Sequence, residues 1–487
     1  MNGCRGLTWV VCLLKAMPAD FPQDGFFRVL AEAQWRLDEG FKHLPAAGVP
    51  GLDDDARAVL GQVAERLCDN FPYGHPLYAG QMLKPPHPVA RAAYALAMSV
   101  NPNNHALDGG RASSAMEVEA VARLAEMFGW RLHLGHLTSG GTFANLEALW
   151  VAGQLTREAD GKAKAIAASS QAHYTHGRIS GVLGLPFVSV PVDGTGCMNL
   201  DALEQMLASG DIGTVVATLG TTAVGSVDAL DKIVALRERY GFRLHVDAAY
   251  GGYFKLAGNL APETRAAFDA IAEADSIVID PHKHGLQPYG CGCVLFRDPS
   301  VGRLYKHDSP YTYFSSNELH LGEISLECSR AGAAAVALWA TQQLLPYEHG
   351  GAFARGLESG RDAALALHCR LATDPRFVAP LAPPALDIAV WAVRASTLEA
   401  SSALAQAIFD KAAKLDLHLA LAKLPVSFFP QGTWKSGHIL ANEQYVTCLR
   451  SVLMKPEHLL WLEEIWARLE KASGQACASI PQSNQRG

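Results

Sequence analysis

The sequence predicts an α/β fold with a mostly parallel central sheet, preceded by a helical segment and followed by a smaller α+β domain. Three observations predict it. Between Ala90 and Leu344, segments with apolar residues at helical spacing alternate with short apolar runs. Polar residues follow several of those runs, at the strand ends where parallel sheets place their ligands. Near Leu344–Gly351 the composition changes, which marks the start of the second domain.

The composition excludes several classes of protein. Of the 487 residues, 49% are hydrophobic and 18% are charged, which is enough apolar material for a large core. The formal net charge is −7, from 41 Lys and Arg against 48 Asp and Glu, which argues against a protein that neutralises nucleic-acid phosphates. No apolar run reaches the roughly 18 residues that a membrane helix needs. We therefore expect a cytoplasmic protein without nucleic-acid or membrane partners.

The N-terminus carries a short apolar run, Leu7–Leu14, between Arg5 and Lys15. Its outline resembles an export signal, but a soluble sequence begins at Met17, so we expect translation to start there rather than at Met1.

The ten cysteines lie far apart and contain no CxxC pair, so neither a disulfide framework nor a zinc site is predicted. Cys291 and Cys293 flank one glycine in a strand-like run, where side chains two residues apart share a face. We expect these two thiols to be packed in the core, and we predict no metal.

The N-terminal segment is predicted to form two amphipathic helices. Apolar residues recur at helical spacing over 26–30 and again over 59–67, on either side of a Gly/Pro-rich turn at 46–52. The Pro-rich stretch 72–88 then crosses to the main domain. Its Tyr73, Tyr78 and Met82 indicate an ordered crossing rather than a flexible linker.

The central region supplies the alternating elements. Helices are expected over Ala115–Phe128, Ala144–Leu155, Leu200–Leu207 and Leu230–Tyr240, and strands over Ala165–Ala168, Thr214–Leu219, Leu244–Val246 and Ser276–Ile279. Strands separated by helices of this length are typical of βαβ units. In the C-terminal domain we expect strands at Ile388–Val393 and Tyr445–Met454, and helices at Thr397–Leu415 and Glu457–Lys471.

Lys283 is the first candidate catalytic residue. It follows the apolar strand 277–279 in the stretch Asp280-Pro281-His282-Lys283. A lysine that loses solvation beside a buried strand has a lowered pKa, and a neutral amine is what a Schiff-base nucleophile requires. Taken alone, such a lysine is more often a solvated loop residue.

Asp247 follows another predicted strand and precedes two small residues, Ala248 and Ala249. A carboxylate there is either a helix N-cap or the anionic partner of a protonated ring nitrogen. In the second case, the small Ala249 would let a flat ring lie against the backbone.

Two further segments fit a cofactor with a phosphate. Ser139-Gly140-Gly141-Thr142 precedes a helix, and amides and hydroxyls at such a helix start can bind an anion. His173 follows a strand, where its imidazole could stack on a ring, although nearby His176 indicates that a histidine here could be incidental.

Taken together, these motifs resemble those of the group II pyridoxal-phosphate-dependent decarboxylases, which include aromatic amino acid, glutamate and tyrosine decarboxylases. The resemblance runs from about Pro22 to Ala472 and keeps the family's order of motifs: His75-Pro76, Ser139-Gly140-Gly141-Thr142, His173-Tyr174-Thr175, Gly220-Thr221-Thr222, Asp247-Ala248-Ala249, His282-Lys283 and Leu449-Arg450. It implies fold type I, the fold of aspartate aminotransferase, with pyridoxal 5'-phosphate as cofactor.

The resemblance also implies roles for individual residues. Lys283 would bind the cofactor covalently, Asp247 would hold the pyridine nitrogen protonated, and His173 would stack on the ring face opposite Ala249. The phosphate would be bound at Ser139, Gly140, Gly141 and Thr142, near His282, and Thr222 would lie beside the ring. Position 280 is Asp where some members of the family have Asn. A contact between Asp280 and the phosphate is therefore in doubt, because two anions would repel each other.

In the family, a tyrosine on a mobile loop returns a proton to the substrate carbon. Here the corresponding segment is 307–317, with Tyr311 and Tyr313, of which Tyr313 is slightly preferred. A tyrosine at this place favours plain decarboxylation over the oxidative variants. The N-terminal helices would be an arm exchanged in a homodimer, which divides the chain into an arm (1–88), a cofactor domain (89–345) and a small domain (346–487).

The expected reaction is decarboxylation of an L-amino acid to an amine and carbon dioxide. Arg450, His75, Tyr78 and Gln81 are the expected substrate residues, with Arg450 meeting the carboxylate. Tyr78 and Met82 suit an aromatic side chain, whereas Gln81 matches glutamate-type members, so an aromatic substrate is favoured and an acidic one stays open. Another lyase or a transaminase of the same fold stays open as well. A nucleotide-binding enzyme, a zinc hydrolase and a cofactor-free interaction protein are disfavoured.

Overall fold

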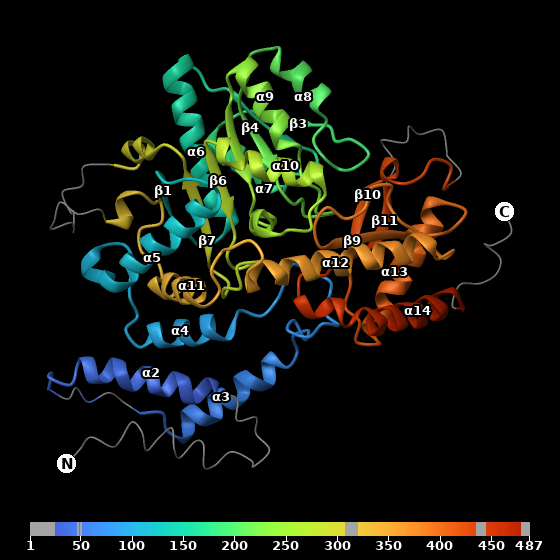
Figure 1. Ribbon diagram of the computed structural model, residues 1–487. Coiled ribbons are helices and arrows are strands. Elements are labelled where there is room, and N and C mark those ends of the chain that lie inside the picture. The colour runs from blue at the N-terminus through green and yellow to red at the C-terminus, as the bar shows by residue number, and fades with distance from the viewer. Residues whose placement is uncertain (1–24, 46–47, 49–50, 307–319, 435–444, 479–487) are drawn as a thin grey trace.

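The computed structural model describes residues 25–45, 48, 51–306, 320–434 and 445–478. Two sheets and their helices make up the body of the molecule, and two N-terminal helices extend from it (Figure 1). None of the helices in the described ranges is long and apolar enough to cross a membrane.

The central sheet is mostly parallel, which confirms the predicted fold class. Its seven strands lie in the order β1-β7-β6-β5-β4-β2-β3. Strands β3, β2, β4, β5 and β6 are parallel neighbours, whereas β7 is antiparallel to both β6 and β1. The strands are β1 (Leu134–Thr138), β2 (Ala165–Ser169), β3 (Phe187–Val190), β4 (Ile212–Thr218), β5 (Arg243–Asp247), β6 (Ser276–Ile279) and β7 (Gly292–Phe296).

Helices cover this sheet as βαβ crossovers require. They are α5 (Leu107–Met127), α6 (Gly141–Asp160), α7 (Thr175–Leu183), α8 (Leu200–Leu207), α9 (Leu230–Tyr240), α10 (Pro262–Asp269) and α11 (Gly332–Leu344), and α4 (Pro88–Met98) packs on α11. Helices α8 and α9 have the predicted bounds. Helix α5 begins eight residues before the predicted Ala115 because its first turns, with Gly109 and Gly110, carry small and polar residues that show no apolar periodicity.

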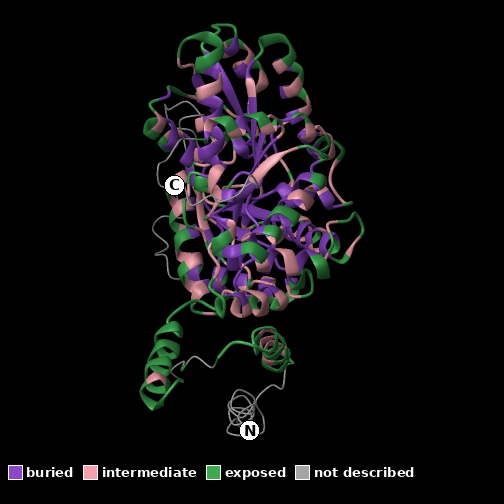
Figure 2. Cartoon of the chain, turned by 90° about the vertical axis from the view of Figure 1, so that its left-hand side faces the viewer, coloured by how far each residue is buried: buried purple, intermediate pink, exposed green. Residues whose placement is uncertain are grey.

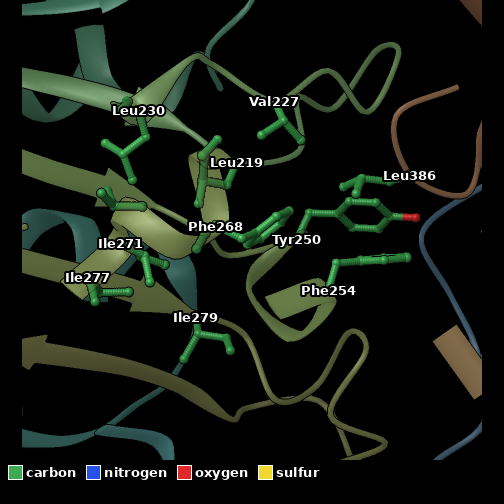
Figure 3. Packing of buried hydrophobic residues seen from close by; sticks show 14 of the residues in the cluster. Leu219, Val227, Leu230, Tyr250, Phe254, Phe268, Ile271, Ile277, Ile279 and Leu386 are labelled. Atoms are coloured by element: carbon green, nitrogen blue, oxygen red, sulfur yellow. The ribbon is translucent and has the colours of Figure 1, made fainter. Parts of the chain in front are cut away.

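The main core lies between the sheet and the helices on one of its faces. Figure 3 shows part of it, where Phe268 and Ile271 pack towards Ile277 of β6, with Leu219 and Leu230 beside them. Each of these side chains is at most 1% exposed. Burial on this scale, at about 25 cal/mol per Å² of apolar surface, fixes the strand ends that carry the polar residues.

The C-terminal region forms a second, antiparallel sheet in the order β10-β11-β9-β8. Its strands are β8 (Phe377–Val378), β9 (Ile388–Val393), β10 (Ala420–Pro425) and β11 (Tyr445–Val452), packed with α12 (Ala352–Thr373), α13 (Leu398–Ala413) and α14 (Leu462–Ala478). Helix α12 runs from the central body to this sheet (Figure 1).

The predicted helix at Glu457–Lys471 begins later than expected. The backbone N–H of Lys455 donates to Nδ1 of His458 at 3.2 Å, which closes a tight 3-10 turn over Pro456–Leu459. Helix α14 therefore begins at Leu462. The other 3-10 turns are η1 (Gly252–Leu256), η2 (Ala270–Glu273), η3 (Pro299–Leu304), η4 (Leu321–Glu323) and η5 (Val426–Phe428).

Helices α2 (Phe26–Gly40) and α3 (Asp54–Leu67) form the N-terminal arm, on either side of the predicted turn. Figure 2 shows α3 coloured almost entirely as exposed, whereas α2 packs on α4 of the body. Neither helix contains a buried residue, although both carry large apolar side chains. Much of the apolar surface of the arm, above all on α3, is therefore exposed in a single chain.

Candidate active site

A cavity of about 380 Å³ opens at the carboxyl ends of β2, β4, β5 and β6. Ten residues predicted to bind a cofactor line this one cavity, although they come from five separate segments: Ser139, Gly140, Gly141, Thr142, His173, Thr222, Asp247, Ala249, His282 and Lys283. Parallel strands bring their carboxyl ends to one edge of a sheet, which is why segments so distant in sequence meet here.

Lys283 lies on the cavity wall and is paired with a carboxylate. Its Nζ is 2.9 Å from Oδ2 of Asp280, three residues earlier in the turn after β6. Burial lowers the pKa of the lysine, but the Asp280 carboxylate, helped by Asp247, outweighs burial and leaves the pKa above its ordinary value. The expectation of a lowered pKa is therefore wrong for this state of the chain, because it considered desolvation without the neighbouring anion.

Asp247 lies at the end of β5 and is 5% exposed. Its Oδ2 is 2.9 Å from Nε2 of His176, and its Oδ1 accepts the backbone N–H of Ala249 at 3.1 Å. Burial alone would raise the pKa of this carboxyl, but the His176 hydrogen bond and the charges of His176 and Lys283 hold it well below its usual range. Asp247 is thus a fixed anion at the inner end of the cavity.

Asn145 connects this carboxylate to a second buried histidine. The amide Nδ2 of Asn145 donates to the carbonyl of Gly141 at 2.8 Å and lies 3.5 Å from Oδ2 of Asp247. Its Oδ1 is 2.8 Å from Nε2 of His245, whose Nδ1 is 2.8 Å from the Ser276 hydroxyl. Burial lowers the pKa of His245 to about 3. This imidazole is therefore neutral and donates to Asn145, which fixes the orientation of the amide beside Asp247.

The loop Ser139–Gly141 starts helix α6 at the cavity edge. The N-cap residue Gly140 has no side-chain cap, so the first amides of this long helix are free to bind an anion. The carboxylate of Glu327 accepts the N–H of Ser139 at 3.0 Å.

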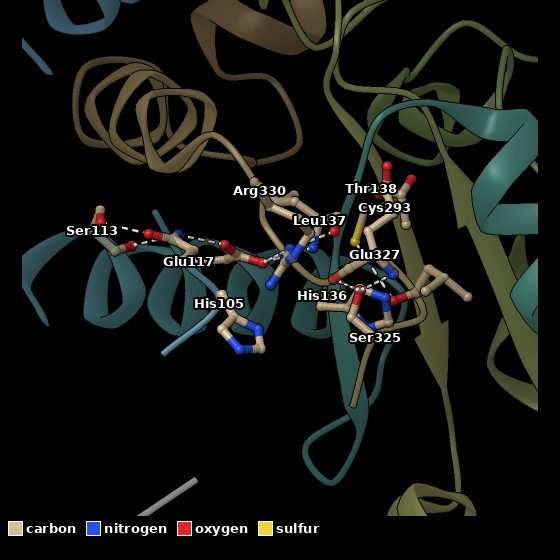
Figure 4. A network of polar contacts seen from close by, with 12 residues as sticks. His105, Ser113, Glu117, His136, Leu137, Thr138, Cys293, Ser325, Glu327 and Arg330 are labelled. Atoms are coloured by element: carbon tan, nitrogen blue, oxygen red, sulfur yellow. Dashed lines mark hydrogen bonds and ion pairs between the residues drawn. The ribbon is translucent and has the colours of Figure 1, made fainter. Parts of the chain in front are cut away.

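A buried ion pair holds the strand before this loop (Figure 4). The guanidinium of Arg330 lies 2.6 Å from Oε1 of Glu117 and donates to the carbonyl of Leu137 at 2.6 Å. The same Glu117 oxygen accepts the N–H of Leu137 at 2.9 Å, and its other oxygen accepts from Asn104 at 2.6 Å. The end of β1 and the loop after it are therefore positioned by a network within the core.

The remaining predicted cofactor residues lie around the cavity opening. The Nδ1 of His173 accepts the N–H of Thr175 at 3.3 Å, and burial lowers the pKa of this imidazole. His282 packs against Tyr289, with ring centroids 4.7 Å apart. Gly220, with φ +103°, provides the turn before Thr222, since a side chain there would be strained and would meet the backbone of Gly251.

The predicted substrate residues do not line this cavity. Arg450 in β11 is 5% exposed, and its Nε and Nη2 have no hydrogen-bond partner among the described residues. Tyr78 is buried, whereas His75 and Gln81 are exposed, and His75 packs edge-on against Trp461. Tyr311 and Tyr313 lie outside the described residues.

Some residues of the site were not predicted, among them Asn145 and Tyr250, which line the cavity. His176 does not line it but contacts Asp247. His176 was set aside as incidental, yet it is the hydrogen-bond partner of Asp247. Asn145 follows Gly141 by four residues on α6, a spacing that places both on one helix face and could have identified it. The hydroxyl of Tyr250 donates to Oδ1 of Asp387 at 2.5 Å, and its ring lies between Leu386 and Phe254 (Figure 3).

The donor set fits a flat, anionic, aldehyde-bearing cofactor. An amine, a buried carboxylate and an uncapped helix start share one cavity, and the hydroxyl of Thr218 on its wall has no partner among the described residues. Cys291 and Cys293 are buried in the core, as expected, and burial raises the pKa of both thiols. In the described part of the chain, no group of three or more His, Cys, Asp or Glu residues could hold a metal ion.

Comparisons with known proteins agree with this donor set. Residues 47–379 match the pyridoxal-dependent decarboxylase conserved domain. The chain is 29% identical to an L-tyrosine decarboxylase of Enterococcus faecium, over 82% of this chain and 85% of that protein. It is 33% identical to a probable L-aspartate decarboxylase of Halobacterium salinarum, over 53% of this chain and 70% of that protein.

Solved structures share the fold at lower identity. Mouse CSAD superposes with a TM-score of 0.73 at 20% identity, over 90% of this chain and 92% of that chain. The Oryza sativa TDC complex with PLP and tryptamine gives a TM-score of 0.72 at 18% identity, over 94% of this chain and 99% of that chain.

Proposed function

The chain belongs to the pyridoxal-dependent decarboxylase family and is a PLP-dependent amino acid decarboxylase, and on that premise we propose that it converts an aromatic L-amino acid to its amine and carbon dioxide. The observation that carries the proposal is the cavity in which Lys283 and the fixed anion Asp247 meet. When bound there, the cofactor supplies an electron-withdrawing ring that accepts the electron pair released as the carboxylate leaves.

We propose that Lys283 is the covalent attachment point and that Asp247 keeps a proton on the ring nitrogen. A carboxylate can hold that proton only if it stays in place, and the 2.9 Å bond from His176 and the N–H of Ala249 keep it there. The amides at the start of α6 would bind the phosphate, near His282. His173 and Ala249 would lie against the two faces of the ring, and Thr222 would lie beside it.

Asp280 is proposed to act on Lys283, a role that the sequence did not predict. Before the cofactor attaches, the Asp280 carboxylate, 2.9 Å from Nζ of Lys283, keeps the amine protonated and in position. Attachment requires the neutral amine, so a proton must leave Lys283, and Asp280 is the group placed to receive it. In this proposal Asp280 serves the lysine rather than the phosphate.

Arg450 is proposed to bind the substrate carboxylate. A buried guanidinium with two unpartnered nitrogens is costly in an empty chain, and a carboxylate that pairs with it removes that cost. The return of the proton to the substrate carbon is assigned to a tyrosine of segment 307–317, with Tyr313 preferred over Tyr311.

The aromatic side chain is favoured over an acidic one by two considerations. Tyr78 and the partly buried Met82 provide apolar surface. Burial raises the pKa of Tyr78 and the charge of Arg450 opposes this, so the tyrosine lies within electrostatic reach of the guanidinium. The Enterococcus faecium relative, which matches over 85% of its own length, is an L-tyrosine decarboxylase. An acidic substrate stays the second candidate, because Gln81 and the aspartate-type relative favour it.

We further propose that the working enzyme is a homodimer in which residues 1–88 form an exchanged arm, 89–345 the cofactor domain and 346–487 the small domain. Exposed apolar residues on the arm support this, among them Trp35 (52% exposed), Val59 (56%), Leu60 (55%) and Leu67 (61%). An apolar face of this size on a separate arm indicates a protein partner.

The test is a decarboxylation assay with tyrosine, tryptophan, phenylalanine, glutamate and aspartate, in which carbon dioxide and amine are both measured. Aromatic substrates should be turned over at least tenfold more efficiently than the acidic ones. The reverse order would assign the acidic substrate class, and transamination without carbon dioxide release would contradict the assigned reaction. Lys283→Ala should abolish turnover and the visible absorbance of the lysine-bound cofactor.

A further inference from the structure

A second cavity, of about 290 Å³, lies on the other side of the loop that carries Lys283. We call it the lysine cavity, because Lys84 and Lys455 both line it. Its walls come from the Pro-rich crossing (Lys84–Pro88), the residues after Lys283, the start of helix α12 and the turn around Lys455. It shares no lining residue with the cofactor cavity.

Backbone carbonyls hold the two lysine ammonium groups. Nζ of Lys455 donates to the carbonyls of Tyr78 at 2.7 Å and Leu83 at 3.3 Å, and Nζ of Lys84 donates to the carbonyl of Met454 at 3.2 Å. Within the described ranges, neither forms an ion pair with a carboxylate. Two ammonium groups that line one cavity and are largely removed from water are unfavourable unless an anion compensates them.

The titration of both groups agrees with this placement. Burial lowers the pKa of Lys84 to about 8, against the opposing charges of Asp387 and Glu457. Burial also lowers the pKa of Lys455 to about 8, with a further contribution from Lys84. Both lysines line the same cavity, which places the two ammonium groups at one site.

A buried histidine also lines the lysine cavity. His284 is 1% exposed, and its Nδ1 has no hydrogen-bond partner in the part of the chain that is described. A ring nitrogen that is buried and unsatisfied next to a cavity is suited to a ligand, since leaving it unpaired destabilises the chain.

Helix α12 adds a fourth feature. It begins at Ala352, and its N-cap Gly351 provides no side-chain cap. Ala352 and Phe353 line the cavity, so the free amides of the first turn and the positive end of a 22-residue helix lie there too. The exposed carboxylate of Glu457 also lines the cavity and limits how much negative charge it can take.

We propose that the lysine cavity is a binding site for one compact oxyanion, either inorganic phosphate or the carboxylate of a small acid. The anion lies between the ammonium groups of Lys84 and Lys455, at the start of α12 and beside His284. Both sources present the same chemistry, namely two or three oxygens that accept hydrogen bonds from cations and amides.

The site is connected to the cofactor cavity through side chains. Nε2 of His284 lies 3.3 Å from Oδ2 of Asp387, and Oδ1 of Asp387 accepts from Tyr250, which lines the cofactor cavity. His284 also follows Lys283 directly in the chain. An anion in the lysine cavity therefore acts on the environment of the cofactor without entering its cavity.

The test uses the cofactor-loaded enzyme, so that the cofactor's own phosphate site is filled. Thermal unfolding is followed while sodium phosphate or sodium acetate is added at constant ionic strength, with sodium chloride as balance. A specific anion should raise the melting temperature saturably, because it binds only the folded chain. If only phosphate raises the melting temperature saturably, the oxyanion is phosphate, and if only acetate does, it is a carboxylate. If both do, the site accepts either oxyanion.

Variants locate the site. Lys84→Gln should weaken the saturable effect by roughly tenfold or more, because one of two cations is lost. Lys232→Gln, which removes an exposed lysine on α9, should leave it unchanged. The affinity of wild-type enzyme should also fall above pH 8, where Lys84 and Lys455 lose their charge.

Two results would overturn the proposal. One is the absence of any saturable shift with either anion in wild-type enzyme. The other is a shift of equal size and midpoint in Lys84→Gln, which would locate the anion elsewhere. Lys84 has no part in the proposed reaction, so a failure here leaves the decarboxylase assignment untouched, and the amino acid screen tests that assignment separately.

Discussion

The Nε2 atom of His176 lies 2.9 Å from Oδ2 of Asp247, and both side chains are buried. This contact decides the charge state of the cofactor cavity, because burial by itself would favour the neutral form of the carboxyl. The histidine comes from α7 and the aspartate from β5, so the packing of the helix on the sheet sets the electrostatics of the site.

The first prediction concerns this pair. His176→Leu should weaken cofactor binding by at least about tenfold, because a buried carboxylate that loses a hydrogen bond costs about 1–3 kcal/mol. His176→Gln retains a donor and should bind within a few-fold of wild type. Cofactor titration of the apoenzyme measures both. Equal affinities for the two variants would show that the contact does not support Asp247.

The second prediction concerns Asp280. Asp280→Asn should lower the pKa of Lys283, because burial still disfavours the ammonium form and the opposing anion is gone. Covalent cofactor attachment should then begin at a lower pH than in wild type, as followed by absorbance across a pH series. Asp211→Asn, at an exposed ion pair with Lys162, is the matched control. An unchanged pH midpoint in Asp280→Asn would contradict the role given to this carboxylate.

The third prediction concerns the ion pair behind the loop at α6. Arg330→Met should destabilise the protein by about 3–5 kcal/mol, because it leaves the Glu117 carboxylate buried without its cation. The double variant Glu117→Gln with Arg330→Met should recover part of that loss, since no lone charge remains. Denaturant unfolding of the three proteins measures this. A double variant less stable than Arg330→Met would count against unpaired charge as the cause.

The fourth prediction concerns pH and His245, whose folded-state pKa is lowered to about 3. Between pH 6.5 and 3 the unfolded chain binds a proton here that the folded chain does not, so stability falls as the pH falls. At pH 5 the loss should be about 2 kcal/mol for this group, relative to pH 7.5. His245→Gln should show a correspondingly smaller loss between these pH values. A slope identical to wild type would mean that His245 takes up its proton equally in the folded and the unfolded chain.

The fifth prediction concerns the N-terminal arm. Val59 and Val63, four residues apart on α3, are 56% and 45% exposed. Their joint replacement by aspartate should leave the stability of a single chain nearly unchanged but should dissociate the proposed dimer, as sedimentation would show. The same change at exposed Leu132 and Val182 of the main body is the control. A dimer that persists in the arm variant would assign its interface to another surface.

The sequence predicted the parallel sheet and its strand-end residues because buried parallel strands are nearly continuous apolar runs. It did not predict β1 and β3, because neither is a continuous apolar run. Strand β3 is an edge strand with exposed side chains, and β1 carries His136, which is buried only because Glu147 lies 2.9 Å from it. Likewise His176 and Asn145 reach Asp247 from helices, and no local pattern marks a contact between separate elements.

The position of β1 also governs when the cofactor cavity can form. In the central sheet β1 pairs only with β7, Leu134 with Phe296 and Thr138 with Gly292. During synthesis β1 leaves the ribosome long before its only neighbour, while β2 to β6 can already associate. The loop that starts α6 therefore stays without its anchor until β7 inserts between β1 and β6. Capture of the cofactor is consequently a late event in the maturation of the chain, and a nascent polypeptide that ends before residue 292 should not retain it.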